Sequence, residues 1–140
     1  MWIQKEIVLS PKKRGFHLIT DEVLQLLPEI SEVSIGLAHI FIQHTSAGLT
    51  INENTDSTVR QDFEQFFNRT VPEDEPYYKH IYEGSDDLPS HIKSSLLGHS
   101  VSVPVTNGHF NMGIWQGLYL CEHRNCGGAR TLLVTLQGQS

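Results

Sequence analysis

The chain has 140 residues, of which 39% are hydrophobic, and its ten Lys and Arg against sixteen Asp and Glu give a formal net charge of −6. A net negative charge is the wrong sign for a protein whose main partner is a polyanion, so composition argues against nucleic-acid binding. The apolar runs are far shorter than the ~20 residues that cross a bilayer, and no secretory segment opens the chain. We expect a cytoplasmic protein with neither a membrane nor a nucleic-acid partner.

The length and the even spread of apolar segments predict one α+β domain over residues 1–140, in which strands dominate and two or three helices are interspersed. Alternating apolar side chains predict a half-buried strand over residues 3–9, and residues 16–19 can resume a strand. A helix with acidic residues in its first turn is expected over residues 20–28, where a proline limits it.

The middle of the chain predicts a central strand followed by a helix. Residues 33–43 are dense in apolar and β-branched side chains and carry little charge, which predicts a strand that is covered on both faces. A shorter strand is expected over 49–52, and Asp56 or Ser57 then caps a helix near 57–68. The apolar stripe of this helix is expected to pack in the core; it consists of Val59, Phe63, Phe66 and Phe67.

A long acidic stretch occupies residues 69–87, and ordered loops of this length often carry function. A short helix near 88–97 follows, holding His91, and Gly98 can take the left-handed position that stops it. The last forty residues predict strands joined by glycine-containing turns, with Trp115 in the core.

Eight histidines are the one compositional excess, and imidazole is the commonest metal ligand in proteins. His80 and His91 flank an acidic segment, and His44 ends the long apolar strand, so the three could meet at one divalent ion. Zinc takes three or four N, S or O ligands at ~2.0–2.3 Å and leaves one position open in catalytic sites. The alternative interpretation is that these histidines are surface or packing residues.

The sequence lacks the motifs of several familiar enzyme classes. Ser46 stands near His44, but no Gly-x-Ser-x-Gly elbow supports a serine hydrolase. A Walker A loop and a GxGxxG fingerprint are also absent, which disfavours nucleoside-triphosphate hydrolysis and dinucleotide binding. Cys121 and Cys126 are too few for the disulfide framework of a small secreted protein.

Short motifs stand in order along nearly the whole chain: His44-Thr45-Ser46-Ala47, Asn52-Glu53-Asn54 with Asp56, Ser90-His91-Ile92-Lys93, Leu97-Gly98, Val103-Pro104-Val105, Gly113 with Trp115-Gln116, and Glu122 with Arg130. Any one of them is a weak signal, but the ordered set is specific. It resembles the YjbQ-type family. One departure is visible after the glutamate, where relatives commonly carry an acidic, Pro-Arg-containing turn and this chain has the residues His-Arg-Asn-Cys-Gly-Gly at 123–128.

The resemblance implies an α+β fold with two packed sheets, a homotrimer, and a polar site that is associated with bound metal in some members. It also implies a secondary thiamine-phosphate synthase activity, which joins a hydroxymethylpyrimidine diphosphate to a thiazole phosphate with loss of diphosphate. Such chemistry needs the leaving oxygens neutralised, for which a divalent metal and Arg or Lys are suited.

We therefore expect a metal-assisted enzyme that acts on a phosphorylated small molecule, and the alternative is a non-catalytic metal- or small-ligand-binding trimeric module. The Asn and Asp residues of the polar segment 44–56 can instead serve only turn and cap hydrogen bonds. The expected catalytic residues are Asp56, Glu122 and Asn54, the expected substrate-binding residues are Ser46, Asn52, Gln116 and Arg130, and the expected ligands of a divalent metal, zinc in the first place, are His44, His80 and His91.

Overall fold

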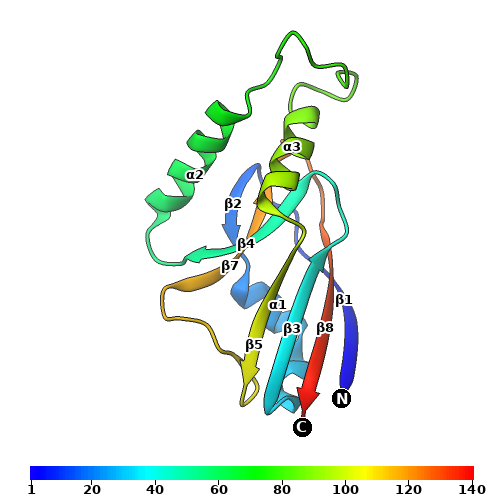
Figure 1. The fold of residues 1–140 in the computed structure, drawn as a ribbon, viewed down its shortest axis with the longest axis vertical. Helices are drawn as coiled ribbons and strands as arrows, with labels where there is room; N and C mark the ends of the chain where they lie inside the picture. The colour runs from blue at the N-terminus through cyan, green and yellow to red at the C-terminus, as the bar shows by residue number, and fades with distance from the viewer.

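Two antiparallel sheets enclose the core in the structure, a computed structural model that describes residues 1–140 (Figure 1). The first sheet has five strands in the order β1 (Trp2–Val8), β8 (Thr131–Gln139), β3 (Ile35–Ile42), β5 (Ser100–Thr106) and β6 (His109–Phe110). The second has three strands in the order β2 (Gly15–Leu18), β7 (Gln116–Glu122) and β4 (Ala47–Glu53). The helices are α1 (Thr20–Leu26), α2 (Ser57–Thr70) and α3 (Asp87–Leu97), with a 3-10 turn at Pro28–Glu32. The predicted α+β domain with two sheets is confirmed.

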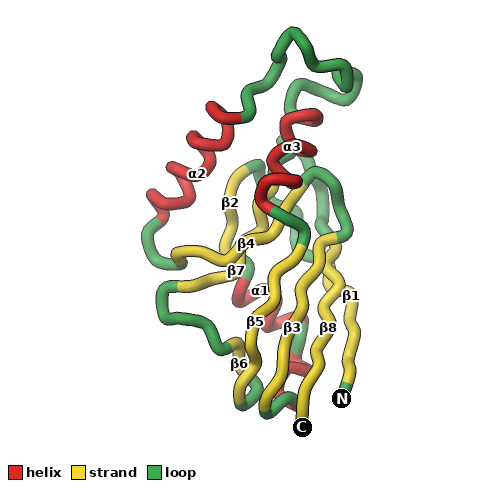
Figure 2. Tube along the Cα trace, viewed as in Figure 1, coloured by secondary structure: helices red, strands yellow, loops and turns green.

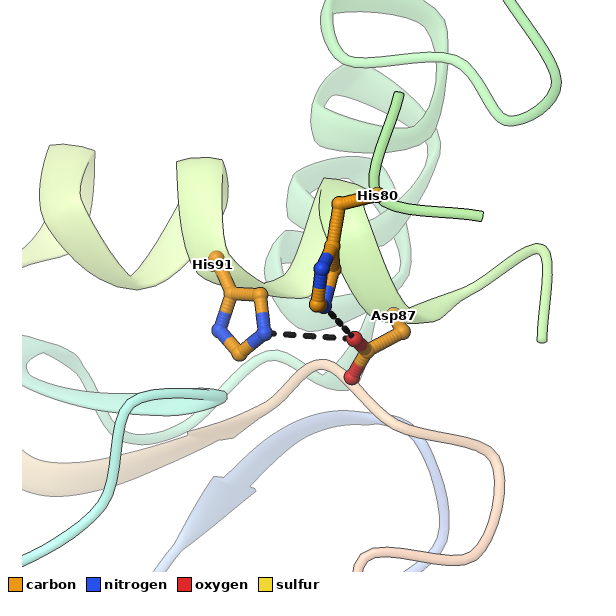
Figure 3. A group of neighbouring side chains, drawn as sticks. All are labelled: His80, Asp87 and His91. Carbon is orange, nitrogen blue, oxygen red and sulfur yellow. Dashed lines mark hydrogen bonds and ion pairs between the residues drawn. The ribbon is translucent and has the colours of Figure 1, made fainter. Parts of the chain in front are cut away.

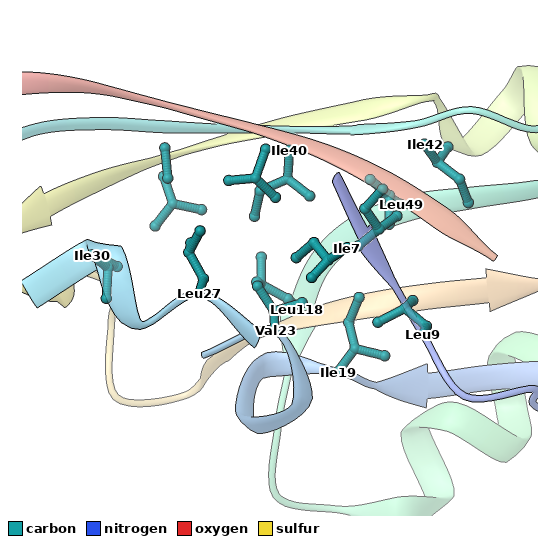
Figure 4. Packing of buried hydrophobic residues seen from close by; sticks show 14 of the residues in the cluster. Ile7, Leu9, Ile19, Val23, Leu27, Ile30, Ile40, Ile42, Leu49 and Leu118 are labelled. Carbon is teal, nitrogen blue, oxygen red and sulfur yellow. The ribbon is translucent and has the colours of Figure 1, made fainter. Parts of the chain in front are cut away.

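The main core lies between the sheets and contains 19 buried hydrophobic residues (Figure 4). Alternate residues of each strand point inward, so that Ile40 of β3 faces Leu118 of β7, and α1 adds Val23 from its apolar side. Each Leu or Ile removed from water in this way contributes roughly 1.5–3 kcal/mol of transfer free energy. The core therefore fixes the relative position of both sheets and of the loops at their ends.

The prediction that the strand near 33–43 is covered on both faces is wrong for the single chain. β3 is central by hydrogen bonding, since β8 and β5 pair with its two edges. Its inward residues are buried, but Ile35 and Leu37 on the other face are 61% and 50% exposed, and Trp2 lies on the same face. An apolar run does not distinguish a strand buried on both sides from one whose second face stays open in the chain.

Helix α2 covers the second sheet only partly (Figure 2). Phe63 and Phe67 pack on Phe16 of β2, with ring centroids 5.4 and 5.7 Å apart. Phe66 is exposed, and no residue of α2 is fully buried. The expectation that the whole stripe is core is therefore wrong at Phe66, because only one side of the stripe faces β2.

Turn chemistry ends the elements largely where the sequence predicts. Gly98 follows α3 with φ of 104°, a conformation that glycine adopts without strain. β7 begins at Gln116, so Trp115 lies in the preceding turn and is 62% exposed, which corrects its assignment to the core.

The two chain ends lie side by side, where the amino group of Met1 donates to the carbonyl of Gly138 (Figure 1). None of the helices is long and apolar enough to cross a membrane.

Candidate metal centre and its pocket

A pocket of about 530 Å³ opens beside α3, between the turn after β3 and the loop that joins α2 to α3. This long loop, residues 71–86, projects from the body of the molecule (Figure 2). Four of the eight histidines line the pocket. Its lining residues are His44, Thr45, Ala47, His80, Leu88, His91, Ser94, Ser95 and His99.

Two of these histidines meet at one buried carboxylate (Figure 3). Asp87 is the first residue of α3 and only 2% exposed, and His91 follows one turn later on the same side of the helix. The Nε2 atom of His80, from the long loop, lies 2.7 Å from Oδ2 of Asp87, and Nε2 of His91 lies 3.3 Å from the same oxygen. The structure thus brings together two of the three histidines that the sequence predicts as ligands.

The hydrogen bonds of His91 fix which of its nitrogens carries a lone pair. Its Nδ1 lies 2.9 Å from the backbone oxygen of Thr45, and a carbonyl oxygen only accepts, so Nδ1 bears the hydrogen. In the neutral ring the lone pair therefore sits on Nε2, which faces the carboxylate of Asp87. Two acceptors that face each other at 3.3 Å require a proton or a cation between them.

The donor set fits a divalent metal. One nitrogen from each of the two histidines and one carboxylate oxygen of Asp87 all lie within 4.8 Å of one another. Tetrahedral zinc with bonds of about 2.1 Å holds its ligand atoms about 3.4 Å apart, so small adjustments would suffice. Two histidines and one carboxylate are a ligand set of catalytic zinc and of other divalent metals with open positions.

Asp87 is held in the ionised form that a metal ligand needs. Burial alone would raise its pKa, but contacts with Glu83 and His80 and the charges of His91 and Arg124 outweigh burial and keep the pKa below its ordinary value. Asp87 is not among the ligands that the sequence predicts. The signal was available, because Asp87 and His91 are four residues apart at the start of a predicted helix.

His44 lines the pocket but lies outside the ligand cluster. Its Nε2 accepts a hydrogen bond from the backbone N–H of Thr131 at 2.9 Å, and its Nδ1 lies 3.3 Å from Nη1 of Arg130. Burial, followed by the charge of Arg130, lowers the pKa of His44. Both ring nitrogens therefore face N–H donors of the chain, and neither offers a lone pair to the pocket.

Glu122 and Arg130 form a buried ion pair beneath the pocket. Arg130 donates from Nε and Nη2 to the two oxygens of Glu122, at 2.7 and 2.6 Å. Arg130 is 4% exposed and Glu122 is fully buried, and neither lines the pocket. Gly127 packs directly on the carboxylate, where a Cβ would overlap it. Ser46 contributes to this region through its backbone oxygen, 3.4 Å from Arg130.

The remaining predicted site residues lie at the opposite end of the second sheet. Ala47 of β4 pairs with Glu122, whereas Glu53 pairs with Gln116, which places the two ends ~20 Å apart at about 3.3 Å per residue. Asn54 donates to the backbone oxygens of residues 114 and 116. Gln116 accepts from the N–H of residue 113, Asn52 accepts from the N–H of residue 53, and Asp56 caps α2 by accepting from Thr58.

The comparison with known proteins decides the family. The profile of UPF0047, YjbQ-like proteins matches residues 5–139. The chain belongs to the UPF0047 family. The UPF0047 protein YjbQ of Escherichia coli O157:H7 is 58% identical over 139 residues, which are 99% of this chain and 100% of that protein. A UPF0047 protein of Synechocystis is 38% identical over 136 residues, 97% of this chain and 92% of that protein.

Solved structures of the UPF0047 family have the same fold. A Clostridium acetobutylicum member is 34% identical with a TM-score of 0.82, over 95% of this chain and 99% of that one. A YbjQ-like protein of unknown function from Sulfolobus solfataricus has a TM-score of 0.85 over 99% of both chains. At 23% identity this second likeness shows the fold alone.

Proposed function

We propose that this UPF0047 protein binds a divalent metal, zinc in the first place, through His80, Asp87 and His91, and holds a phosphorylated small molecule beside it. The observation that carries the proposal is the lone pair of His91 Nε2, which faces the carboxylate of Asp87 at 3.3 Å. A cation between these acceptors removes their repulsion. His44, expected as the third ligand, would instead form part of the pocket wall.

The pocket suits a small anionic ligand. Its volume of about 530 Å³ lies within the usual range for small-molecule sites. No Lys or Arg lines it, so a bound divalent ion would neutralise phosphate oxygens and a departing diphosphate. Thr45 and His99 also line the pocket, and their hydroxyl and imidazole groups are suited to orient the ligand.

Thiamine-phosphate synthase-like chemistry is the reaction we propose for this site. The C–O bond between a pyrimidine methylene and its diphosphate breaks, a C–N bond to the thiazole nitrogen forms, and diphosphate leaves. This substitution requires orientation and charge neutralisation more than a protein nucleophile. The absence of a catalytic triad from the pocket is compatible with that requirement.

Metal content tests the ligand set directly. We expect elemental analysis to find stoichiometric metal in the wild type and in His109→Ala, which changes an exposed histidine on β6, and little in His91→Ala. Equal metal content in the wild type and His91→Ala would overturn the ligand assignment. Because neutral imidazole is the ligand form, protons compete with the metal and binding should weaken as the solution is acidified.

The alternative is a non-catalytic module that binds a metal or a small ligand. It is favoured by one observation: Glu122, Asn54 and Asp56, the expected catalytic residues, all make structural bonds away from the pocket. Two experiments distinguish the enzyme from the module. One is a steady-state assay of metal-loaded protein with both thiamine precursors, and the other is complementation of a strain that lacks the primary synthase. Bound metal without product formation or growth would favour the module.

The outer face of the first sheet supports a homotrimer. Trp2, Ile35 and Leu37 are exposed there. Among the outward positions of β1, β8, β3 and β5, Glu6 is the only Asp, Glu, Lys or Arg. Depletion of charge is a feature of protein interface cores. Light scattering tests the assembly, and a mass near 15.8 kDa at micromolar concentration would contradict it.

A further inference from the structure

Arg124 lies behind the metal cluster, on the loop between β7 and β8, and its guanidinium group joins three separate acceptors. Nη1 donates to Oδ1 of Asp87 at 2.5 Å, and Nε donates to Oδ2 of Asp86 at 2.8 Å. Nη2 donates to the backbone oxygen of Glu83 at 3.0 Å. The backbone N–H of Arg124 donates to Oε2 of Glu122 at 3.1 Å, which links Arg124 to the buried ion pair of Glu122 and Arg130.

These bonds divide the carboxylate of Asp87 between two partners. Oδ1 is taken by Arg124, whereas Oδ2 faces His80 and His91. Asp87 is almost inaccessible to water, so Arg124 is the group that keeps Oδ1 turned away from the histidines. A carboxylate held in this way can give a metal one oxygen and not two.

The charge of Arg124 acts in the same direction. Three carboxylates surround the centre: Asp86 and Asp87 are buried, and Oε2 of Glu83 lies 3.2 Å from Nε2 of His80. The guanidinium group, paired with Asp86 and Asp87, offsets one of these three negative charges, so that a divalent ion would bring the centre to neutral instead of leaving it negative. A neutral centre repels a phosphate group less than a negative one, and the pocket lining supplies no Lys or Arg.

We propose that Arg124 is a positioning residue of the metal centre, which makes Asp87 a one-oxygen ligand and thereby keeps a coordination position open for a phosphorylated ligand. This inference rests on the proposed function. Residues that hydrogen-bond to metal ligands often orient those ligands without touching the metal, and the inference assigns this role to Arg124.

Cobalt(II) is a suitable probe because its visible absorption reports the number and arrangement of its ligands. We expect Arg124→Ala to change the visible spectrum of bound Co²⁺, as Asp87 gains freedom to chelate with both oxygens, and to change Co²⁺ affinity by about 10–100-fold. Millimolar guanidinium chloride, which can refill the vacated space, should restore part of the affinity and of the spectrum. The matched control is Arg69→Ala, which removes an exposed arginine at the end of α2 and should change neither.

The outcomes separate the two proposals. No Co²⁺ binding by the wild type would overturn the metal centre and this inference with it. Equal affinity and spectrum in the wild type and Arg124→Ala would overturn only the role of Arg124, and so would weaker binding with an unchanged spectrum and no response to guanidinium. If Arg124→Ala does not fold, Arg124→Lys carries the test: a lysine keeps the charge but lacks the planar fork of donors that reaches three separate acceptors, so an unchanged spectrum would overturn the inference.

Discussion

The ion pair of Glu122 and Arg130 is the most deeply buried ion pair in the molecule, and its removal should affect stability first. We predict that Glu122→Gln lowers the free energy of unfolding by about 3–5 kcal/mol, because it leaves the guanidinium group buried without a counter-charge. Urea denaturation measures the change. The control is Glu29→Gln, which removes the partly exposed pair with Lys5 and should change stability little. Similar losses in both variants would contradict the prediction.

His123 should make stability depend on pH. Burial, followed by the charges of Lys93, Arg14 and Arg130, lowers its pKa to about 3. The ordinary value in an unfolded chain is about 6.5, so below that pH the unfolded chain binds a proton that the folded protein does not. The free energy of unfolding should therefore fall by about 1.4 kcal/mol per pH unit as the pH decreases from about 6.5 toward 3.

The substitution His123→Gln isolates this contribution. Carboxylates titrate in both proteins and cancel when the two pH profiles are compared. Urea denaturation at each pH gives the slope of the free energy of unfolding against pH. Between about pH 5 and 6.5 we expect this slope to be smaller in the variant, by the contribution of about one proton. Parallel profiles for the two proteins would show that His123 is protonated equally in the folded and unfolded states.

At the scale of elements, the middle of the long loop, residues 76–82, is tied to α3 by a single histidine. Between residues 76 and 82 the only hydrogen-bonding side chain that reaches α3 is His80, through Asp87. Tyr78 bonds only within the loop, and Ile81 and Tyr82 are exposed. The order of this segment should therefore follow the state of the cluster that His80 joins.

Metal removal should open this loop. We predict that a chelator increases the rate at which trypsin cleaves after Lys79, an exposed residue next to His80, and that added zinc reverses the increase. Mass spectrometry identifies the cleavage site. His80→Ala should be cleaved quickly with or without zinc, whereas cleavage at other sites should change little. Zinc protection that persists in His80→Ala would contradict the prediction.

The elements themselves were largely predictable from local pattern, but their environments were not. Periodicity and capping residues place α3 and its stop at Gly98 correctly, because these signals act within one or two turns. The exposure of Leu37 and Trp115 depends on which other segments cover them, and a local pattern does not contain that information. The pairing of Glu122 with Arg130 likewise depends on the β7–β8 loop, in which Gly127 packs on the carboxylate.

The candidate site shows the same division. His80 and His91 were identified because histidine is an uncommon residue with few structural uses, and spacing alone suggested that they could converge. His44 was placed with them, but its Nε2 is occupied by the N–H of Thr131, which is distant in the chain. Asp87 was passed over because acidic residues are common in this stretch, and only the fold shows that it is buried and faces the two histidines.

At the scale of the whole molecule, the open face of the first sheet should control assembly. We predict that Leu37→Glu, which places a charge at the centre of this face, gives a particle near 15.8 kDa by light scattering while the circular dichroism spectrum stays unchanged. The control is Leu96→Glu, an exposed position on α3 that should keep the mass of the wild type. An unchanged mass in Leu37→Glu would show that the subunits meet elsewhere.

The strand order also bears on how the chain reaches this structure during synthesis. β8 is the last strand in chain order, yet it lies between β1 and β3 and pairs with both. Until β8 leaves the ribosome, β1 has no partner and one edge of β3 stays open. The ligands of the candidate centre emerge earlier, on α3 and the loop before it. A nascent chain can therefore complete its metal-binding segment while the first sheet is still unformed, and closure of that sheet must wait for contacts between residues more than 130 positions apart.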